Sequence, residues 1–181
     1  MRKINLATTL WSCLLAVTVP IASQTPTPEG SSAPAYRDPF TVKYEFAGKG
    51  KVEQKFDKSP YVSEKTIYVF PGEEFGINVR REGEEIVEIS YQPDLKKADV
   101  TFKFEAQKTM MLLTTKSELD KMLVMEGWML LPGRNEPVKT SLLPVQPHLF
   151  GIESWPHPIV KVELKNLRLS TPPKVRPGPR Q

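Results

Sequence analysis

Apolar and polar residues alternate along four separate stretches of the chain. The apolar positions are Val42, Tyr44 and Phe46; Phe75, Ile77 and Val79; every second residue from Ala98 to Ala106; and Val160, Val162 and Leu164. A period of two places apolar side chains on one face of a β-sheet and polar ones on the other. The pattern therefore predicts a domain built from β-strands.

The last of these stretches contains an irregularity. After Lys165 the apolar positions shift by one residue, so that Leu167 and Leu169 are apolar while Asn166 and Arg168 are polar. Such a shift would turn the second half of a regular strand to the wrong face. An extra residue restores the facing, so we expect a β-bulge near Asn166.

Short turn sequences separate the alternating stretches. They are Gly48-Lys49-Gly50, Pro71-Gly72, Glu82-Gly83-Glu84 and Pro132-Gly133-Arg134-Asn135. Tight turns join antiparallel strands, whereas parallel strands need longer crossover connections for which the spacing leaves little room. The fold class predicted is all-β: a single antiparallel β-sandwich, immunoglobulin-like in architecture.

The stretch from residue 117 to residue 131 permits two interpretations. Ser117 and Asp120 occupy the key positions of a helix capping box, and Leu119, Met122 and Leu123 follow at helical spacing. Residues 121–131 also read as a buried strand that is apolar on both faces. Because the neighbouring elements are all β, the strand preceded by a short turn or helix at 117–120 is favoured.

The N-terminal residues resemble a secretory signal. Arg2 and Lys3 precede an uncharged, apolar stretch that ends in Pro20 and the small residues Ala22 and Ser23. This order of features predicts a signal peptide over residues 1–23. It also predicts a periplasmic or secreted protein that has no stable membrane span after cleavage. One alternative is an uncleaved membrane anchor, but the apolar stretch is short for a span and is interrupted by polar residues. The other is lipid attachment at Cys13, but a lipid-attachment motif needs small residues before the cysteine and Trp11 is too large.

Composition divides the remainder into three parts. Residues 24–38 are rich in Pro, Ser and Thr and predict a disordered linker, residues 39–170 form the foldable domain, and residues 171–181 predict a disordered, basic, proline-rich tail. Cys13 is the single cysteine. Its removal with the signal would leave no thiol for metal binding, nucleophilic catalysis or redox chemistry.

The charge of the chain lies mostly at its ends. The formal net charge is +4, of which the expected signal carries two positive charges and the tail three (Lys174, Arg176 and Arg180). The domain is therefore close to neutral. A nucleic-acid-binding domain would show a basic face, so we expect no nucleic-acid partner.

Three residue patterns could indicate a metal or catalytic site, and none of them is a strong signal. Five of the six methionines lie between residues 110 and 129 (Met110, Met111, Met122, Met125 and Met129). Thioethers suit Cu(I), which makes a soft-metal carrier one alternative function, but flexible methionines more often fill a core. The two histidines, His148 and His157, are too few for a zinc site. Ser154 and His157 lie beside Glu153, but no nucleophile elbow accompanies them, so we expect no enzyme, no cofactor and no metal.

The segment from Thr140 to Pro158 is both apolar and rich in proline. Prolines belong at sheet edges, so this segment is expected to cover an open edge of the core or to face a partner. The residues proposed for such a partner surface are Trp155, Phe150, Leu149 and Ile152. The function favoured is a non-catalytic binding or assembly module for an unknown protein or glycan partner; a carbohydrate-binding module that stacks sugars on Trp128, Trp155 or Tyr91 is the second alternative.

Overall fold

The computed structural model describes residues 35–171, which contain strands throughout and one short 3₁₀ helix, η1 (Leu95–Lys97). The strands form two five-stranded antiparallel sheets and two smaller pairs. The first sheet, here the β9 sheet, has the order β13 (Phe150–Trp155), β10 (Met111–Ser117), β9 (Val100–Ala106), β7 (Glu73–Glu82), β8 (Glu85–Gln92). The second, the β14 sheet, has the order β12 (Val138–Thr140), β11 (Met122–Leu130), β14 (Lys161–Ser170), β6 (Thr66–Val69), β5 (Val62–Ser63).

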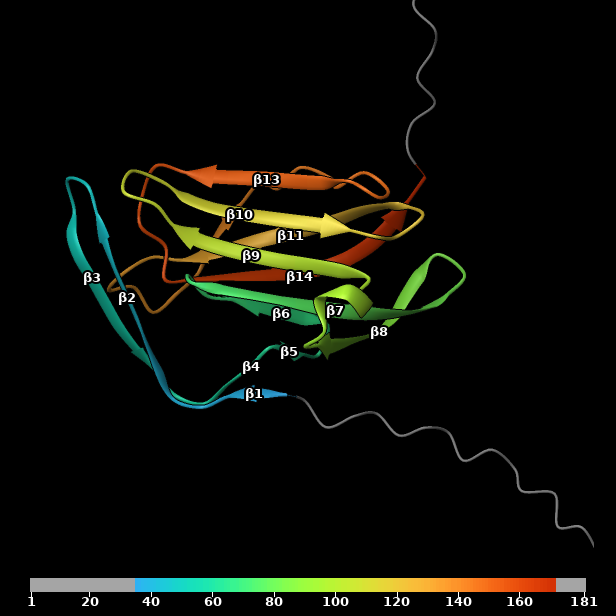
Figure 1. The fold of residues 1–181 in the computed structure, drawn as a ribbon, viewed down its shortest axis with the longest axis horizontal. Helices are drawn as coiled ribbons and strands as arrows, with labels where there is room; N and C mark the ends of the chain where they lie inside the picture. Colours follow the sequence, from blue (N-terminus) through green and yellow to red (C-terminus); the bar gives the residue numbers. More distant parts are fainter. Residues whose placement is uncertain (1–34, 172–181) are drawn as a thin grey trace, which may run out of the picture. The chain divides into compact units, whose positions relative to one another are not determined.

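The two sheets pack face to face (Figure 1). Their inner faces form one apolar core, to which β7 and β9 contribute Phe75, Phe102 and Phe104, and the β14 sheet contributes Ile67 and Leu164. All of these except Ile67 are positions that the alternation of the sequence marks as apolar. The predicted all-β sandwich is confirmed.

The irregularity in the last strand is also confirmed. Between Lys165 and Arg168 the register of β14 against β11 shifts by one residue, so that β14 has one residue more than β11 over this stretch. Asn166 lies there with φ 52°, a left-handed conformation that asparagine tolerates better than most residues. The bulge lets both Leu164 and Leu169 be buried.

Residues 121–131 adopt the strand of the two interpretations. Met122–Leu130 is β11, paired with β12 on one side and β14 on the other. No helix forms at 117–120. Ser117 ends β10 instead, and its hydroxyl accepts a hydrogen bond from the Leu119 amide at 3.3 Å, so the capping-box pattern makes a turn rather than a helix start.

A hairpin of β2 (Phe40–Phe46) and β3 (Gly50–Phe56) lies at one end of the sandwich (Figure 1). It forms a second small core in which Val42 and Val52 are buried with Phe70, Leu130 and Val160. The Tyr44 hydroxyl donates to the Ile159 carbonyl at 2.8 Å. The hairpin is thus joined to the connection that leads into β14.

The burial of Tyr44 predicts a loss of stability in alkali. Burial raises the pKa of Tyr44 to about 12. The unfolded chain releases this proton near pH 10 and the folded chain does not, so the contribution to stability is complete below pH 10 and is lost as the pH rises from 10 to about 12. In urea unfolding followed over this range, Tyr44→Phe should flatten the alkaline decline. Parallel pH curves for the two proteins would contradict this account.

The ordered part of the chain begins earlier than the composition suggested. Tyr36 and Arg37, which the sequence placed in the linker, form β1 (Tyr36–Arg37) and pair with β4 (Ser59–Pro60). Only 6% of the Arg37 surface is exposed. This side chain is the reason that the segment is held against the sandwich.

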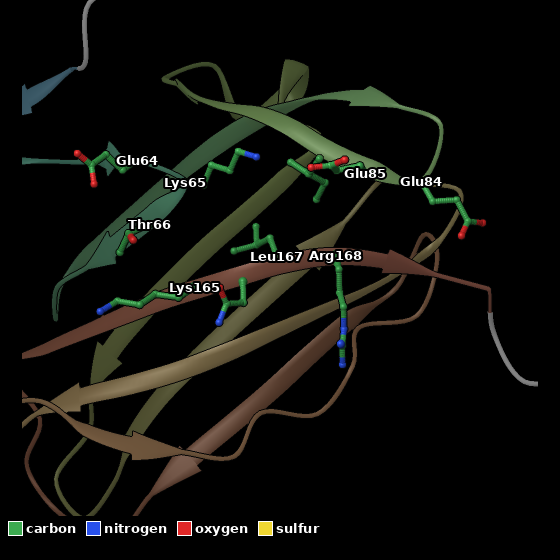
Figure 2. Close-up of a pocket in the computed structure, with 10 residues that line it drawn as sticks. Glu64, Lys65, Thr66, Glu84, Glu85, Lys165, Leu167 and Arg168 are labelled. Carbon is green, nitrogen blue, oxygen red and sulfur yellow. The ribbon is translucent and has the colours of Figure 1, made fainter.

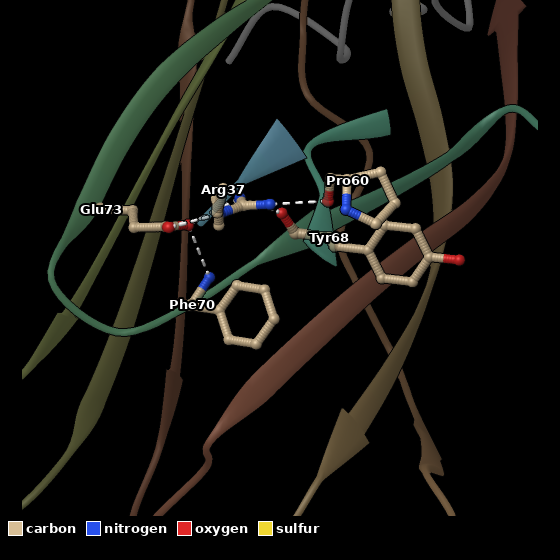
Figure 3. A network of polar contacts seen from close by, with 5 residues as sticks. All are labelled: Arg37, Pro60, Tyr68, Phe70 and Glu73. Carbon is tan, nitrogen blue, oxygen red and sulfur yellow. Dashed lines mark hydrogen bonds and ion pairs between the residues drawn. The ribbon is translucent and has the colours of Figure 1, made fainter. Parts of the chain in front are cut away.

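Arg37 is bound on every side (Figure 3). Its guanidinium donates to both carboxylate oxygens of Glu73, through Nη2 at 2.7 Å and through Nε, and to the carbonyls of Pro60 at 2.6 Å and Tyr68 at 2.8 Å. It also lies 3.7 Å from the centre of the Tyr61 ring, a cation–π contact. A planar, bidentate donor is needed for this set of partners, and lysine could not replace it.

Candidate functional site: the free edge of strand β13

Strand β13 is one edge of the β9 sheet, and within residues 35–171 it pairs only with β10. Its outward side chains include Phe150, 64% exposed, and Ile152, 51% exposed. Leu149, just before the strand, is 55% exposed. We call Leu149, Phe150 and Ile152 the β13 strip. It is an uncharged apolar surface on a strand that lacks the lysines and prolines with which proteins usually protect a sheet edge.

The backbone of β13 has unused hydrogen-bonding groups along its outer side. The Ser117 amide donates to the Leu149 carbonyl at 2.9 Å, which shows that the backbone groups of Leu149 point toward β10. In an antiparallel strand this direction alternates from residue to residue, so the groups of Phe150, Ile152 and Ser154 point away from β10. Among residues 35–171 no other strand and no backbone group pairs with these three on that side.

The inward side of β13 carries the opposite pattern. Gly151, Glu153 and Trp155 point toward the other sheet, while the apolar Phe150 and Ile152 point outward. The reason is Val145, a buried residue that bridges to Leu123; a Cβ on Gly151 would lie 3.1 Å from its Cγ2. The segment before β13 therefore covers an open edge of the core. This is one of the two roles expected for residues 140–158.

Trp155 does not belong to the exposed surface for which it was proposed. It is 7% exposed, packs in the core edge-on against Phe104, and donates its Nε1–H to the Thr140 hydroxyl at 3.0 Å. Glu153 is also engaged, because its Oε1 accepts a hydrogen bond from the Leu143 amide. Of the four residues named from the sequence, Leu149, Phe150 and Ile152 are together at the surface and Trp155 lies beneath them.

The aromatic residues considered as sugar platforms are covered. Trp128, partly buried, has the ammonium groups of Lys139 and Lys165 at 5.7 and 5.5 Å from its ring centre. Tyr91 stacks on Tyr61 with ring centres 4.0 Å apart. Trp155 is buried, and Trp128 and Tyr91 both contact other side chains, which does not favour a flat stacking surface for glycans.

The methionines are distributed rather than gathered. Met111, Met125 and Met129 are buried core residues, Met110 is 38% exposed, and the Met122 sulfur accepts a hydrogen bond from Gln146. Met122 and Met129 are seven residues apart on β11, which separates them by about 23 Å along the strand. This arrangement is typical of methionines that fill a core, and it does not bring their sulfurs together around one Cu(I) ion.

The residues of the triad considered from the sequence do not form one. Ser154 and Glu153 are neighbours on β13 and so point to opposite faces. The buried Nδ1 of His157 has no hydrogen-bond partner among the described residues. His148 is exposed and lies 3.9 Å from Glu118, and no group of three histidine, aspartate, glutamate or cysteine side chains in residues 35–171 is placed to hold a metal ion.

A mixed-charge groove lies at the opposite edge of the sandwich (Figure 2). It has a volume of about 350 Å³ and lies between the β5–β6 turn, the β7–β8 turn and the bulge in β14. Acidic and basic side chains alternate around it, and two of them are engaged outside it: Glu84 with Lys121, and Lys165 with Glu163. Hydrogen bonding to Lys121 lowers the pKa of Glu84. The balance of charges selects no class of ligand.

The outer face of the β14 sheet carries a structural ion triplet. Burial acts to raise the pKa of Glu163, but hydrogen bonds from Lys161 and Lys165, each at 2.7 Å, outweigh it and hold the pKa below its usual range. Each carboxylate oxygen of Glu163 is engaged by one of the two lysines, so the carboxylate has no free oxygen for a ligand.

Comparison of the chain with models of protein families, with curated proteins and with solved structures found no match. In residues 35–171 no helix has the length and apolar character needed to cross a membrane. The signal peptide expected at residues 1–23, residues 24–34 of the expected linker, and all but Thr171 of the tail expected at 171–181 lie outside the described residues.

Proposed function

We propose that this chain is an exported, non-catalytic module that acts in assembly by binding an extended segment of another protein along β13. The observation that carries the proposal is the free edge itself: three residues direct unused amide and carbonyl groups outward, and two of them carry exposed apolar side chains. Export is proposed from the sequence pattern of residues 1–23.

The chemistry of the edge favours a strand as its occupant. Backbone donors and acceptors that recur at every second residue match those of an added β-strand, and the alternating side chains then supply specificity. The outward row Phe150, Ile152 and Ser154 carries no charge. We therefore expect a partner segment with apolar residues at alternate positions, periplasmic or secreted like the module itself.

A proline at position 152 tests the proposal with little disturbance of the fold. The Ile152 amide points away from β10, so Ile152→Pro removes a donor from the free edge and none from the internal ladder. The purified chain would be used to select binders from a library of random linear peptides. The enriched peptides should show alternating apolar residues, bind the parent chain, and lose that binding with Ile152→Pro.

Val138→Lys is the control, because Val138 is an exposed apolar residue (42%) on β12, an edge strand of the β14 sheet. It should bind the selected peptides as the parent does. Failure to enrich any peptide, or equal binding by Ile152→Pro when circular dichroism shows it folded, would overturn the proposal.

A further inference from the structure

A second groove lies at the end of the sandwich where β13 meets the β2–β3 hairpin. It has a volume of about 460 Å³ and is bounded by β3, by the turn after β11 and by the connection from β13 to β14. We call its four basic residues, Lys49, Lys51, Arg134 and His157, the basic groove. The rest of the lining is mainly apolar: Val52, Leu131, Pro132 and Pro158.

The groove has an excess of positive charge that the described residues do not neutralise. Its one acidic lining residue, Glu53, is paired with Lys43 at 3.0 Å. Lys51 has only a long contact of 3.9 Å with Glu45, and both side chains are mostly exposed, so this pair is weak. Within residues 35–171, Arg134 and Lys49 have no acidic partner within ion-pair distance.

His157 contributes its imidazole ring to the lining of the groove. Its Nδ1 is buried against the protein and has no hydrogen-bond partner among the described residues. The ring is held in place, because prolines flank it and the next residues are fixed: the Ile159 carbonyl accepts from Tyr44 and the Val160 amide donates to Leu130. The unpaired cations are what complements an anion, and the fixed ring beside them senses any anion that enters the groove.

We infer that the basic groove binds an anionic group, a phosphate or a carboxylate, with Arg134 and Lys49 supplying charge and hydrogen-bond donors. Charge-assisted hydrogen bonds of this kind are about twice as strong as neutral ones. The apolar lining suits a ligand in which the anion is attached to a carbon framework. The inference is independent of the β13 strip, which lies on a different surface.

The two histidines of the chain make the inference directly measurable. The ring signals of His157 and His148 would be followed by NMR while inorganic phosphate or, separately, acetate is added at constant pH and ionic strength. His148 is an internal control, since it is exposed on the connection before β13. Saturable shifts of His157 alone, with either anion, would support the site, and the stronger anion would identify the ligand class.

Variants separate a site from general ion binding. The Lys49→Ala/Arg134→Ala double variant should weaken binding by about tenfold. Lys96→Ala removes a positive charge from η1 and should leave the affinity for the anion unchanged. Unsaturable shifts shared by both histidines, no shift with either anion, or full affinity in the double variant would overturn the inference without affecting the proposal for β13.

Discussion

Replacing Arg37 with alanine should lower the free energy of unfolding by about 3 kcal/mol, because removing one partner of a buried ion pair leaves the other groups unsatisfied. The substitution removes the donors for the carbonyls of Pro60 and Tyr68 and both hydrogen bonds to Glu73. The lower end of the range for buried pairs applies, since the Glu73 side chain is 23% exposed and water can reach it. Urea unfolding followed by circular dichroism measures the change.

Two variants make this test specific. Arg37→Lys keeps the charge but not the planar fork, so it should recover only part of the loss. Arg80→Ala removes an arginine that is ion-paired with Glu88 but largely exposed, and it should change stability little. If Arg37→Ala and Arg80→Ala have the same stability, Arg37 does not anchor the N-terminal segment as the structure implies.

Trp155→Ala should also be strongly destabilising, by about 3–5 kcal/mol, as is usual when a large aromatic side chain is removed from a core. The change empties the space beside Phe104 and leaves the Thr140 hydroxyl without its indole donor. Thermal and urea unfolding of the full chain would report it, with circular dichroism as the signal because Trp155 contributes to the fluorescence.

Ile152→Ala is the matched control on the same strand. Ile152 points outward and is half exposed, so its removal should change the free energy of unfolding by no more than about 0.5 kcal/mol. This pair of variants distinguishes the two faces of β13. Equal effects at both positions would contradict the inward placement of Trp155.

The sequence was a sound guide wherever the apolar period was regular. Val42, Phe75, Phe102 and Leu164 are buried in the strands that the alternation predicts, and the shift of period at Asn166 located a bulge. These predictions hold because burial of one sheet face imposes the period directly on the residues. Residues 117–120 were harder, since a capping pattern and a turn use the same side chains.

Two features had no local signal. Arg37 stands at the end of a proline- and serine-rich stretch, and its main partner, Glu73, is 36 residues away. On β13 the apolar residues point outward and Gly151 points inward, because Val145 from the preceding segment already fills the inner space. The burial of Trp155 therefore depends on a tertiary contact, which the alternation along β13 alone could not show.

The position of β14 has a consequence for how the domain is made. Among the described residues β14 is the last strand in sequence, yet it lies between β11 and β6 in the centre of its sheet. A chain that emerges N-terminus first has no strand to join these two until residues 161–170 have followed, and pairings so distant in sequence form slowly. Closure of the β14 sheet must therefore wait until residues 161–170 have been synthesised, long after β6 and β11.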